Sequence, residues 1–277
     1  MLPYRETGHD CGMGHVAART AGTGPAVLLL HGIGGSAASF AAQQGRLDGY
    51  TTIAWDAPGY GASDDPVGTS AHAEPADRYA RAAVDLLNGL GHERAHVVGV
   101  SWGGVIATRM ALRHPEALMS LTLAGSSRGS GRTEDGRAAM LRRIDDLATR
   151  GPDEFAALRG PNLLAPGAPG ALAERVVALM AQVRLPGYRG AAEMMAATDH
   201  SASLGDIRVP TLVLAGEHDR VTGIPESEAL AAGIPGARFT VLPGGGHAVN
   251  QENPAAFNTA VCRFLRLVES GGQAGRQ

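Results

Sequence analysis

Short aliphatic segments alternate with longer alanine-rich segments along most of the 277-residue chain, and this alternation constrains the fold more than any other feature. The segments 26–31, 95–100 and 210–216 are apolar at nearly every position. Such runs are typical of strands that helices bury on both faces. Strands that alternate with helices predict a doubly wound, mostly parallel α/β sheet. The expected strands are 15–20, 26–31, 51–56, 95–100, 118–125, 210–216 and 237–244, and the expected helices are 36–46, 77–90, 102–113, 224–233 and 254–269.

The alternation stops between about 128 and 205, where helical patterns surround the connector "RGPNLLAPGAPG". These helices could form a second layer of the same core or a lid over a site at the strand ends. We expect a lid, because the motifs described below all fall on loops at one edge of the sheet. The predicted domains are therefore a core formed by 1–127 and 206–277 and a helical cap formed by 128–205.

Composition and charge exclude several classes of function. Hydrophobic residues make up 44% and charged residues 18%, as in a globular protein, and the net charge of −3 gives no reason to expect nucleic acid or an acidic membrane as a partner. The chain has no lysine, so neither a Schiff-base lysine nor a P-loop lysine is possible. The histidines lack metal-ligand spacing, and we expect no metal and no cofactor. A small-molecule substrate is the expected partner, and the oligomeric state stays open.

The N-terminal segment and the cysteines indicate a cytoplasmic protein. The first ten residues are polar, unlike a secretory signal, and no apolar run is long enough to span a membrane. Cys11 and Cys262 are expected to be unpaired thiols in a reducing compartment.

The stretch "GVSWG" at 99–103 follows an expected strand and begins an expected helix. This is the context of a G-x-S-x-G nucleophile elbow. Ser101 must adopt a strained backbone conformation there, and Gly99 and Gly103 leave room for so sharp a turn. The alternative is a serine that only caps the helix.

A nucleophilic serine needs a base, and the base needs an orienting acid. Asp219 and His247 each follow a later strand, which gives the order Ser, Asp, His along the chain. Glu217 is a competing acid. His200 is a competing base, but it lies in the inserted segment, where nothing positions it relative to the serine.

The turn "GIGGSA" at 32–37 also fits a dinucleotide fingerprint, with Asp56 as the ribose-binding acid. Three observations count against this interpretation. His31 precedes the turn, as in loops that supply an oxyanion donor. Asp56 opens the Pro-Gly corner "DAPGYGAS", and a dinucleotide site would leave Ser101 and its glycines unexplained.

Together, "HGIGGS", "DAPGYGAS", "GVSWGG", "GEHD" and "GGGH" resemble the α/β-hydrolase superfamily over residues 31 to 247. The resemblance is strongest to 3-oxoadipate enol-lactonases, meta-cleavage C–C hydrolases and carboxylesterases. It implies an eight-stranded sheet with an antiparallel second strand, a cap after the sixth strand, and an oxyanion hole formed by the backbone amides of Ile33 and Trp102. Many C–C hydrolases have an aromatic residue after the catalytic histidine, whereas this chain has Ala248.

These observations predict a serine hydrolase that cleaves a small ester or lactone, with Ser101, Asp219 and His247 as catalytic residues. The alternatives are hydrolysis of a C–C bond in a diketone, cofactor-independent oxygenase or peroxidase chemistry, and a non-enzymatic ligand receptor. The candidate substrate pocket is formed by His31, Gly32, Trp102, Arg128, Arg184, Arg189, Met194 and Met195. The methionines could equally be core residues and the arginines solvated.

Overall fold

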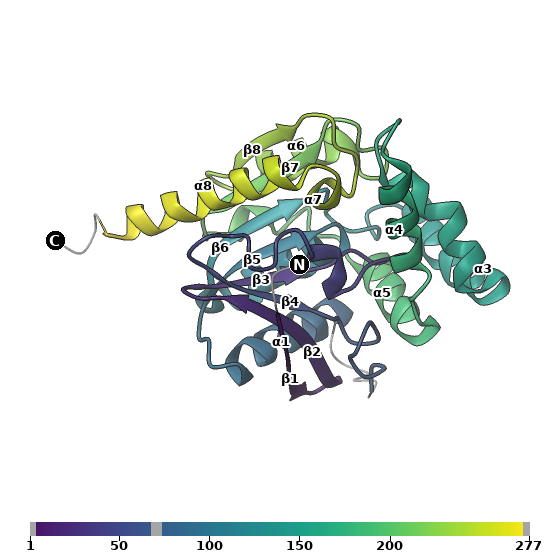
Figure 1. Cartoon of the computed structure of the whole chain (residues 1–277), viewed down its shortest axis with the longest axis horizontal. Helices are drawn as coiled ribbons and strands as arrows, with labels where there is room; N and C mark the ends of the chain where they lie inside the picture. The colour runs from purple at the N-terminus through teal and green to yellow at the C-terminus, as the bar shows by residue number, and fades with distance from the viewer. Residues whose placement is uncertain (1–3, 68–73, 274–277) are drawn as a thin grey trace.

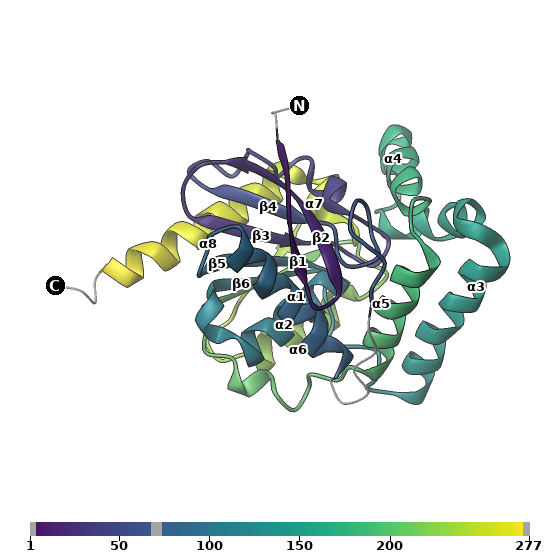
Figure 2. The ribbon, with the colours of Figure 1, turned by 90° about the horizontal axis from the view of Figure 1, so that it is seen from below.

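The computed structural model describes residues 4–67 and 74–273, which form an eight-stranded sheet between helices (Figures 1 and 2). The strands are β1 (Arg5–Cys11), β2 (Gly14–Gly22), β3 (Ala26–Leu30), β4 (Thr51–Trp55), β5 (Ala95–Val100), β6 (Leu118–Ala124), β7 (Thr211–Gly216) and β8 (Arg238–Leu242). Their spatial order is β1-β2-β4-β3-β5-β6-β7-β8. β2 is antiparallel to both of its neighbours, and the pairs from β4 to β8 are parallel. This confirms the predicted mostly parallel α/β sheet and its antiparallel second strand.

Alternate side chains of each central strand face opposite helical layers. In β3, Leu28 and Leu30 pack into one apolar cluster and Val27 and Leu29 into the other, and all four are fully buried. The first cluster takes in side chains of α1 (Pro75–Gly89), α2 (Trp102–Arg113) and α6 (Gly223–Gly233), and the second takes in side chains of α8 (Pro254–Gln273). Figure 1 shows α8 and α1 on opposite sides of the sheet. Because both faces of these strands are buried, their sequences do not alternate between polar and apolar residues.

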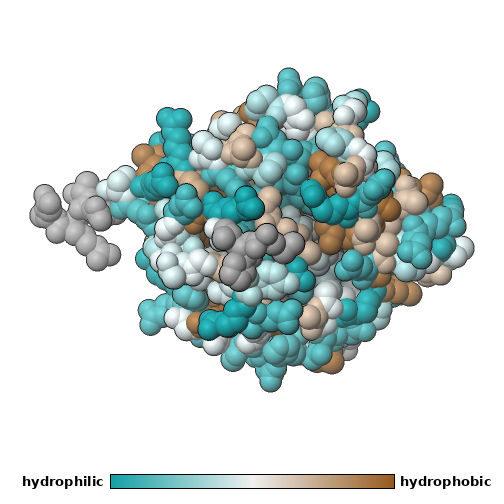
Figure 3. Space-filling model, viewed as in Figure 1, coloured by the Kyte–Doolittle hydropathy of each residue, from teal (hydrophilic) through white to brown (hydrophobic). Residues whose placement is uncertain are grey.

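Three α-helices lie between β6 and β7, together at one end of the molecule (Figures 1 and 2): α3 (Glu134–Arg159), α4 (Gly170–Met180) and α5 (Leu185–Ala197). The Thr133 hydroxyl accepts a hydrogen bond from the Gly136 amide at 3.0 Å, which caps the start of α3. In Figure 3, apolar surface is visible where these helices meet the rest of the chain. The start of α5 lies directly on the loop after β4, since a Cβ atom on Gly187 would lie 2.2 Å from the Gly59 carbonyl oxygen.

β1 was not predicted from the sequence, and the helix predicted at 36–46 is wrong. β1 is an edge strand with exposed polar residues, so it lacks the aliphatic run that marks the inner strands. The segment 36–46 forms only a short 3₁₀ turn, Ala37–Phe40, and Gly45 then takes a positive φ of 63°. The Asp56 carboxylate accepts a hydrogen bond from the Ala37 amide at 2.7 Å, which holds this turn against the end of β4.

Cys11 and Cys262 are both unpaired thiols, as expected. Within 4–67 and 74–273, no helix combines the length and the apolar composition that a membrane span requires.

Candidate active site

Ser101 occupies the sharp turn between β5 and α2, with φ 55° and ψ −119°. Among the described residues it is the one non-glycine residue with positive φ. A Cβ atom on Gly99 would lie 2.4 Å from the Gly103 carbonyl oxygen, and one on Gly103 would lie 2.1 Å from the Leu30 carbonyl oxygen. Both contacts are too short for any side chain, so the glycines are what allow this strained turn.

The end of the neighbouring strand β6 holds the turn in place. The Ser101 amide donates to the carbonyl oxygen of Ala124, at the end of β6, at 2.9 Å. The Ser126 hydroxyl donates to the Ser101 carbonyl oxygen at 2.9 Å. The strained residue is therefore fixed by two hydrogen bonds to the adjacent strand end, as a preorganised site requires.

His247 and Asp219 form a buried pair on the loops after β8 and β7. The His247 Nδ1 atom lies 3.0 Å and 3.1 Å from the two carboxylate oxygens of Asp219. That carboxylate also accepts hydrogen bonds from the Thr222 hydroxyl at 2.8 Å and the Val221 amide at 2.8 Å. Burial alone would raise the pKa of Asp219, but the hydrogen bonds from His247, Thr222 and Val221 outweigh it and hold the pKa well below its usual range. The carboxylate is ionised and orients the imidazole through Nδ1, which leaves Nε2 for chemistry.

The two competing residues lie elsewhere. Glu217 is exposed, and its carboxylate accepts a hydrogen bond from the Gly244 amide at 2.9 Å. His200 is buried with its Nε2 atom 3.2 Å from the Val105 carbonyl oxygen, and burial lowers its pKa to about 4. In the structure, Asp219 therefore pairs with His247, while Glu217 and His200 have other partners.

The backbone amides of Ile33 and Trp102 have no hydrogen-bond acceptor among the described residues, and both residues line a cavity together with Ser101. His31 holds the loop after β3, which contains Ile33. Its Nε2 atom accepts from the Ala57 amide at 3.0 Å, and its Nδ1 atom lies 2.8 Å from the Gly32 carbonyl oxygen. Because Nε2 is an acceptor, the proton is assigned to Nδ1, and burial lowers the pKa of this neutral imidazole. His31 thus connects the loop after β3 to the loop after β4.

Ser101 and His247 line one cavity of about 320 Å³. The predicted pocket residues His31 and Gly32 also line it. A second cavity, of about 270 Å³, adjoins it and is lined by Trp102 and Met195. The two cavities share the residues Ile33, Ser101, Arg143 and Val221.

The structure places the other predicted pocket residues away from the main cavity. Arg128 pairs with Glu226 at 2.9 Å, and Arg184 pairs with Asp65 at 2.9 Å. Arg189 is exposed to solvent. These arginines were predicted because they lie in the inserted segment, but two of them form ion pairs elsewhere and the third is in solvent.

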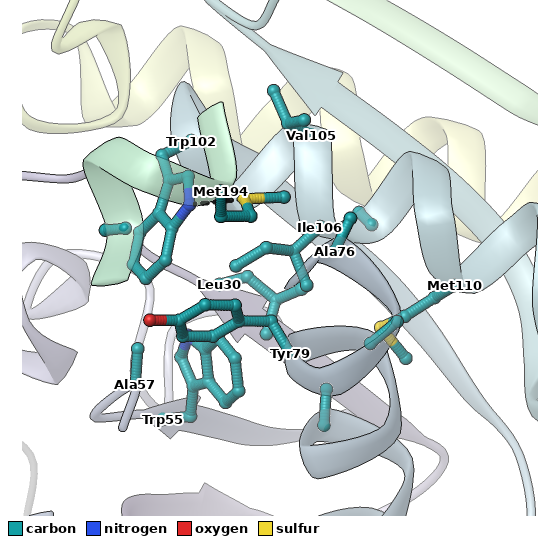
Figure 4. Close-up of a cluster of buried hydrophobic side chains, with 14 of the residues drawn as sticks. Leu30, Trp55, Ala57, Ala76, Tyr79, Trp102, Val105, Ile106, Met110 and Met194 are labelled. Atoms are coloured by element: carbon teal, nitrogen blue, oxygen red, sulfur yellow. Dashed lines mark hydrogen bonds between the residues drawn. The ribbon is translucent and has the colours of Figure 1, made fainter. Parts of the chain in front are cut away.

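Met194 is a core residue and does not line the main cavity. Its sulfur accepts a hydrogen bond from the Trp102 indole nitrogen at 3.0 Å, and it is fully buried among α1, α2 and α5 side chains (Figure 4). The Trp102 ring packs edge-on against Tyr79 in the same cluster. The hydrogen bond from Trp102 to Met194 joins the start of α2 to the inserted helix α5.

The sequence analysis missed the arginines that do line the cavity: Arg143, Arg159 and Arg220. One signal could have found Arg143. It lies on the inward stripe of α3 formed by Met140, Ile144 and Leu147, at helical spacings of three and four residues. A charged residue on such a stripe is unusual unless it has a function.

The structure does not support the dinucleotide interpretation. The two carboxylate oxygens of Asp56 accept hydrogen bonds from the amides of Ala37, at 2.7 Å, and Ala62, at 3.1 Å. The side chain is buried and holds the loops at the end of β4. It is therefore engaged within the protein rather than free to bind a ribose.

Comparisons with known proteins all point to the same family. Residues 27–260 match the model of the "Alpha/beta hydrolase family". A proposed carbamate hydrolase, RutD of Variovorax paradoxus, is 34% identical over 261 residues, covering 90% of this chain and 94% of that protein. The 2-hydroxymuconate semialdehyde hydrolase of Pseudomonas putida is 32% identical, covering 96% and 90%. A thermophilic esterase from Thermogutta terrifontis has a similar structure, with a TM-score of 0.86, 26% identity and coverage of 95% and 99%.

Proposed function

The chain belongs to the alpha/beta hydrolase family, and from that premise we propose that it is a serine hydrolase that cleaves a small carboxylic ester or lactone through an acyl-enzyme intermediate. One observation carries the proposal. A strained serine and a histidine oriented by a buried carboxylate line the same cavity. A serine hydroxyl needs this kind of assistance to act as a nucleophile.

In the proposed reaction, Ser101 Oγ attacks the acyl carbon while His247 Nε2 takes the hydroxyl proton. The ester C–O bond then breaks, and His247 returns the proton to the departing alcohol. Water attacks the acyl-enzyme in the same way, which releases the carboxylic acid and restores the serine. Asp219 keeps the imidazole in the required tautomer and stabilises its protonated form.

The amides of Ile33 and Trp102 are the proposed oxyanion donors. Both lack an acceptor among the described residues, and both flank Ser101 in the cavity walls. Such a donor typically contributes about 10²–10³ in rate, because it is already oriented before charge develops on the oxygen.

We further propose that residues 128–205 act as the lid of a core formed by 1–127 and 206–277. Side chains of all three inserted helices, among them Arg143, Val176 and Tyr188, line the cavity that also contains Ser101. A lid of this kind would exclude water and set substrate shape.

The test is a pre-steady-state assay with p-nitrophenyl acetate. An acyl-enzyme that forms faster than it is hydrolysed gives an initial burst of p-nitrophenolate, and Ser101→Ala should abolish both the burst and turnover. Full activity of Ser101→Ala would contradict the proposal and favour cofactor-independent chemistry on the same scaffold.

A second candidate is hydrolysis of a C–C bond in a meta-cleavage diketone, which the relative from Pseudomonas putida favours. Ala248 argues against it, since this residue packs in a small apolar cluster with Leu164, Leu172 and Val176 instead of presenting an aromatic ring. Comparing kcat/KM for 2-hydroxymuconate semialdehyde and for simple esters separates the two candidates.

A further inference from the structure

The main cavity has an excess of positive charge in a protein that is acidic overall. The described residues that line it include Arg143, Arg159 and Arg220 and no aspartate or glutamate. The chain as a whole has a net charge of −3. A concave site of one sign attracts ligands of the opposite sign.

The three arginines are not equivalent. Arg159 lies 3.2 Å from the Asp146 carboxylate and stacks over the Phe155 ring, 5.0 Å from its centroid. Arg220 is exposed and also borders a third cavity beside the main one, so it lies toward the outside. Arg143 is half-buried, and its neighbour is the hydroxyl of Tyr188. In the described part of the chain, no carboxylate forms a salt bridge with Arg143.

Arg143 is the one of these three arginines that lines both cavities. It lies in the wall shared by both cavities, together with Ser101 and Ile33. Its position on the apolar stripe of α3 holds the guanidinium group inward rather than in solvent. A partly buried charge without a counter-ion is unfavourable, and a bound anion would remove that cost.

We propose that Arg143 binds a carboxylate group of the substrate, so that the enzyme acts on esters or lactones that carry a free carboxylate in addition to the bond that is cleaved. This inference rests on the proposed function. A guanidinium group suits the role because its planar fork binds a carboxylate through two parallel hydrogen bonds, whereas an ammonium group acts as a point charge. Arg143 is a specificity-determining residue in this account and takes no part in proton transfer.

The experiment uses two pairs of esters that differ only in replacing a methyl group by a carboxylate. Monomethyl adipate and methyl hexanoate place the difference on the acyl side, and 6-acetoxyhexanoate and hexyl acetate place it on the alcohol side. Acid release is followed in a pH-stat with the full-length protein. In at least one pair, kcat/KM of the carboxylate ester should exceed that of the neutral ester by about tenfold or more, the effect expected of a charge-assisted hydrogen bond.

Arg143→Gln should reduce that ratio to about one or below, while the matched variant Arg142→Gln should preserve it. Arg142 is the adjacent residue on α3, exposed and of the same charge, so it controls for the loss of one positive charge. The ratio within a pair cancels any loss of folded protein. Should Arg143→Gln fail to fold, the wild-type ratio and its decrease at raised ionic strength still test the proposal.

Two results would overturn the inference while leaving the proposed hydrolase in place. One is a wild-type enzyme whose kcat/KM for the carboxylate ester is no higher than for the neutral ester in both pairs. The other is a kcat/KM ratio that does not change in Arg143→Gln. Failure of the proposed function would look different. The wild type would then leave all four esters uncleaved, and the inference would fall with it.

Discussion

At the scale of single residues, the site depends on which side chains the loops turn inward. The order of Ser101, Asp219 and His247 along the chain was enough to predict that they meet at one sheet edge, because parallel strands end there together. Sequence alone selected Asp219 over the nearby Glu217, and the hydrogen bonds of the loop give the physical reason why Asp219 pairs with His247. The Asp219 carboxylate is directed inward because it accepts hydrogen bonds from the Val221 and Thr222 amides of its own loop. The Glu217 carboxylate instead accepts a hydrogen bond from the exposed Gly244 amide.

Asp219→Asn should lower kcat by about 10⁴-fold, as the equivalent change does in serine proteases, because the amide favours the wrong tautomer of His247. Steady-state ester hydrolysis measures the effect. Glu217→Gln is the matched control, since it removes the competing carboxylate, and it should leave kcat within a factor of about two because surface changes are usually small. A larger loss in Glu217→Gln than in Asp219→Asn would reverse the assignment of the acid.

Arg143 was not among the arginines predicted from the sequence to line the pocket. The inserted segment contains many arginines, and sequence alone selected Arg128, Arg184 and Arg189. Glu226 and Asp65, the partners of Arg128 and Arg184, are far away along the chain, so no local pattern could have revealed these two ion pairs. The apolar stripe of α3 is the local signal for Arg143, and the packing of α3 against α5 directs this residue to the cavity.

At the scale of elements, the buried strands, the edge strand β8 and the long helices were predictable, and the opposite edge strand β1 was not. An inner strand must be apolar on both faces, which leaves a clear aliphatic run, while β1 needs only backbone pairing on one side. The helix expected at 36–46 failed because the hydrogen bond from the Ala37 amide to Asp56 is a tertiary contact that alanine content does not reveal.

The junction between β5 and α2 allows a sharp test at this scale. Gly103→Ala should destabilise the fold by about 1–3 kcal/mol or more, because the new Cβ atom would meet a backbone carbonyl that cannot move aside. Gly170→Ala is the control. Gly170 is also a helical glycine, at the start of α4, but nothing lies within 4 Å of its added Cβ atom. Urea unfolding followed by circular dichroism gives both values, and equal stability of the two variants would contradict the account of the elbow.

At the scale of the whole molecule, the fold buries neutral histidines, and its stability should therefore depend on pH. His200 is the clearest case, because burial lowers its pKa to about 4, below the usual 6.5. The unfolded chain binds a proton at this residue below pH 6.5 and the folded protein does not until about pH 4. Its contribution to stability is therefore lost as the pH falls through that window.

Lowering the pH from 7.5 to 5 should cost the wild type about 2 kcal/mol of unfolding free energy through this residue. His200→Gln should be less sensitive to pH by that amount, because glutamine can still donate to the Val105 carbonyl oxygen and does not titrate. Urea midpoints at the two pH values measure the difference. Identical pH dependence of wild type and variant would show that folding does not lower the pKa of His200.

If this fold makes Ser101 a nucleophile, a serine-reactive reagent should label that residue covalently. Folded protein is treated with a fluorophosphonate and its intact mass is measured, followed by peptide mapping. We expect one adduct, at Ser101, formed by attack of Oγ on phosphorus with loss of fluoride. His247→Gln should slow its formation strongly. Absence of an adduct in folded protein, or an adduct at another residue that persists in Ser101→Ala, would contradict this expectation.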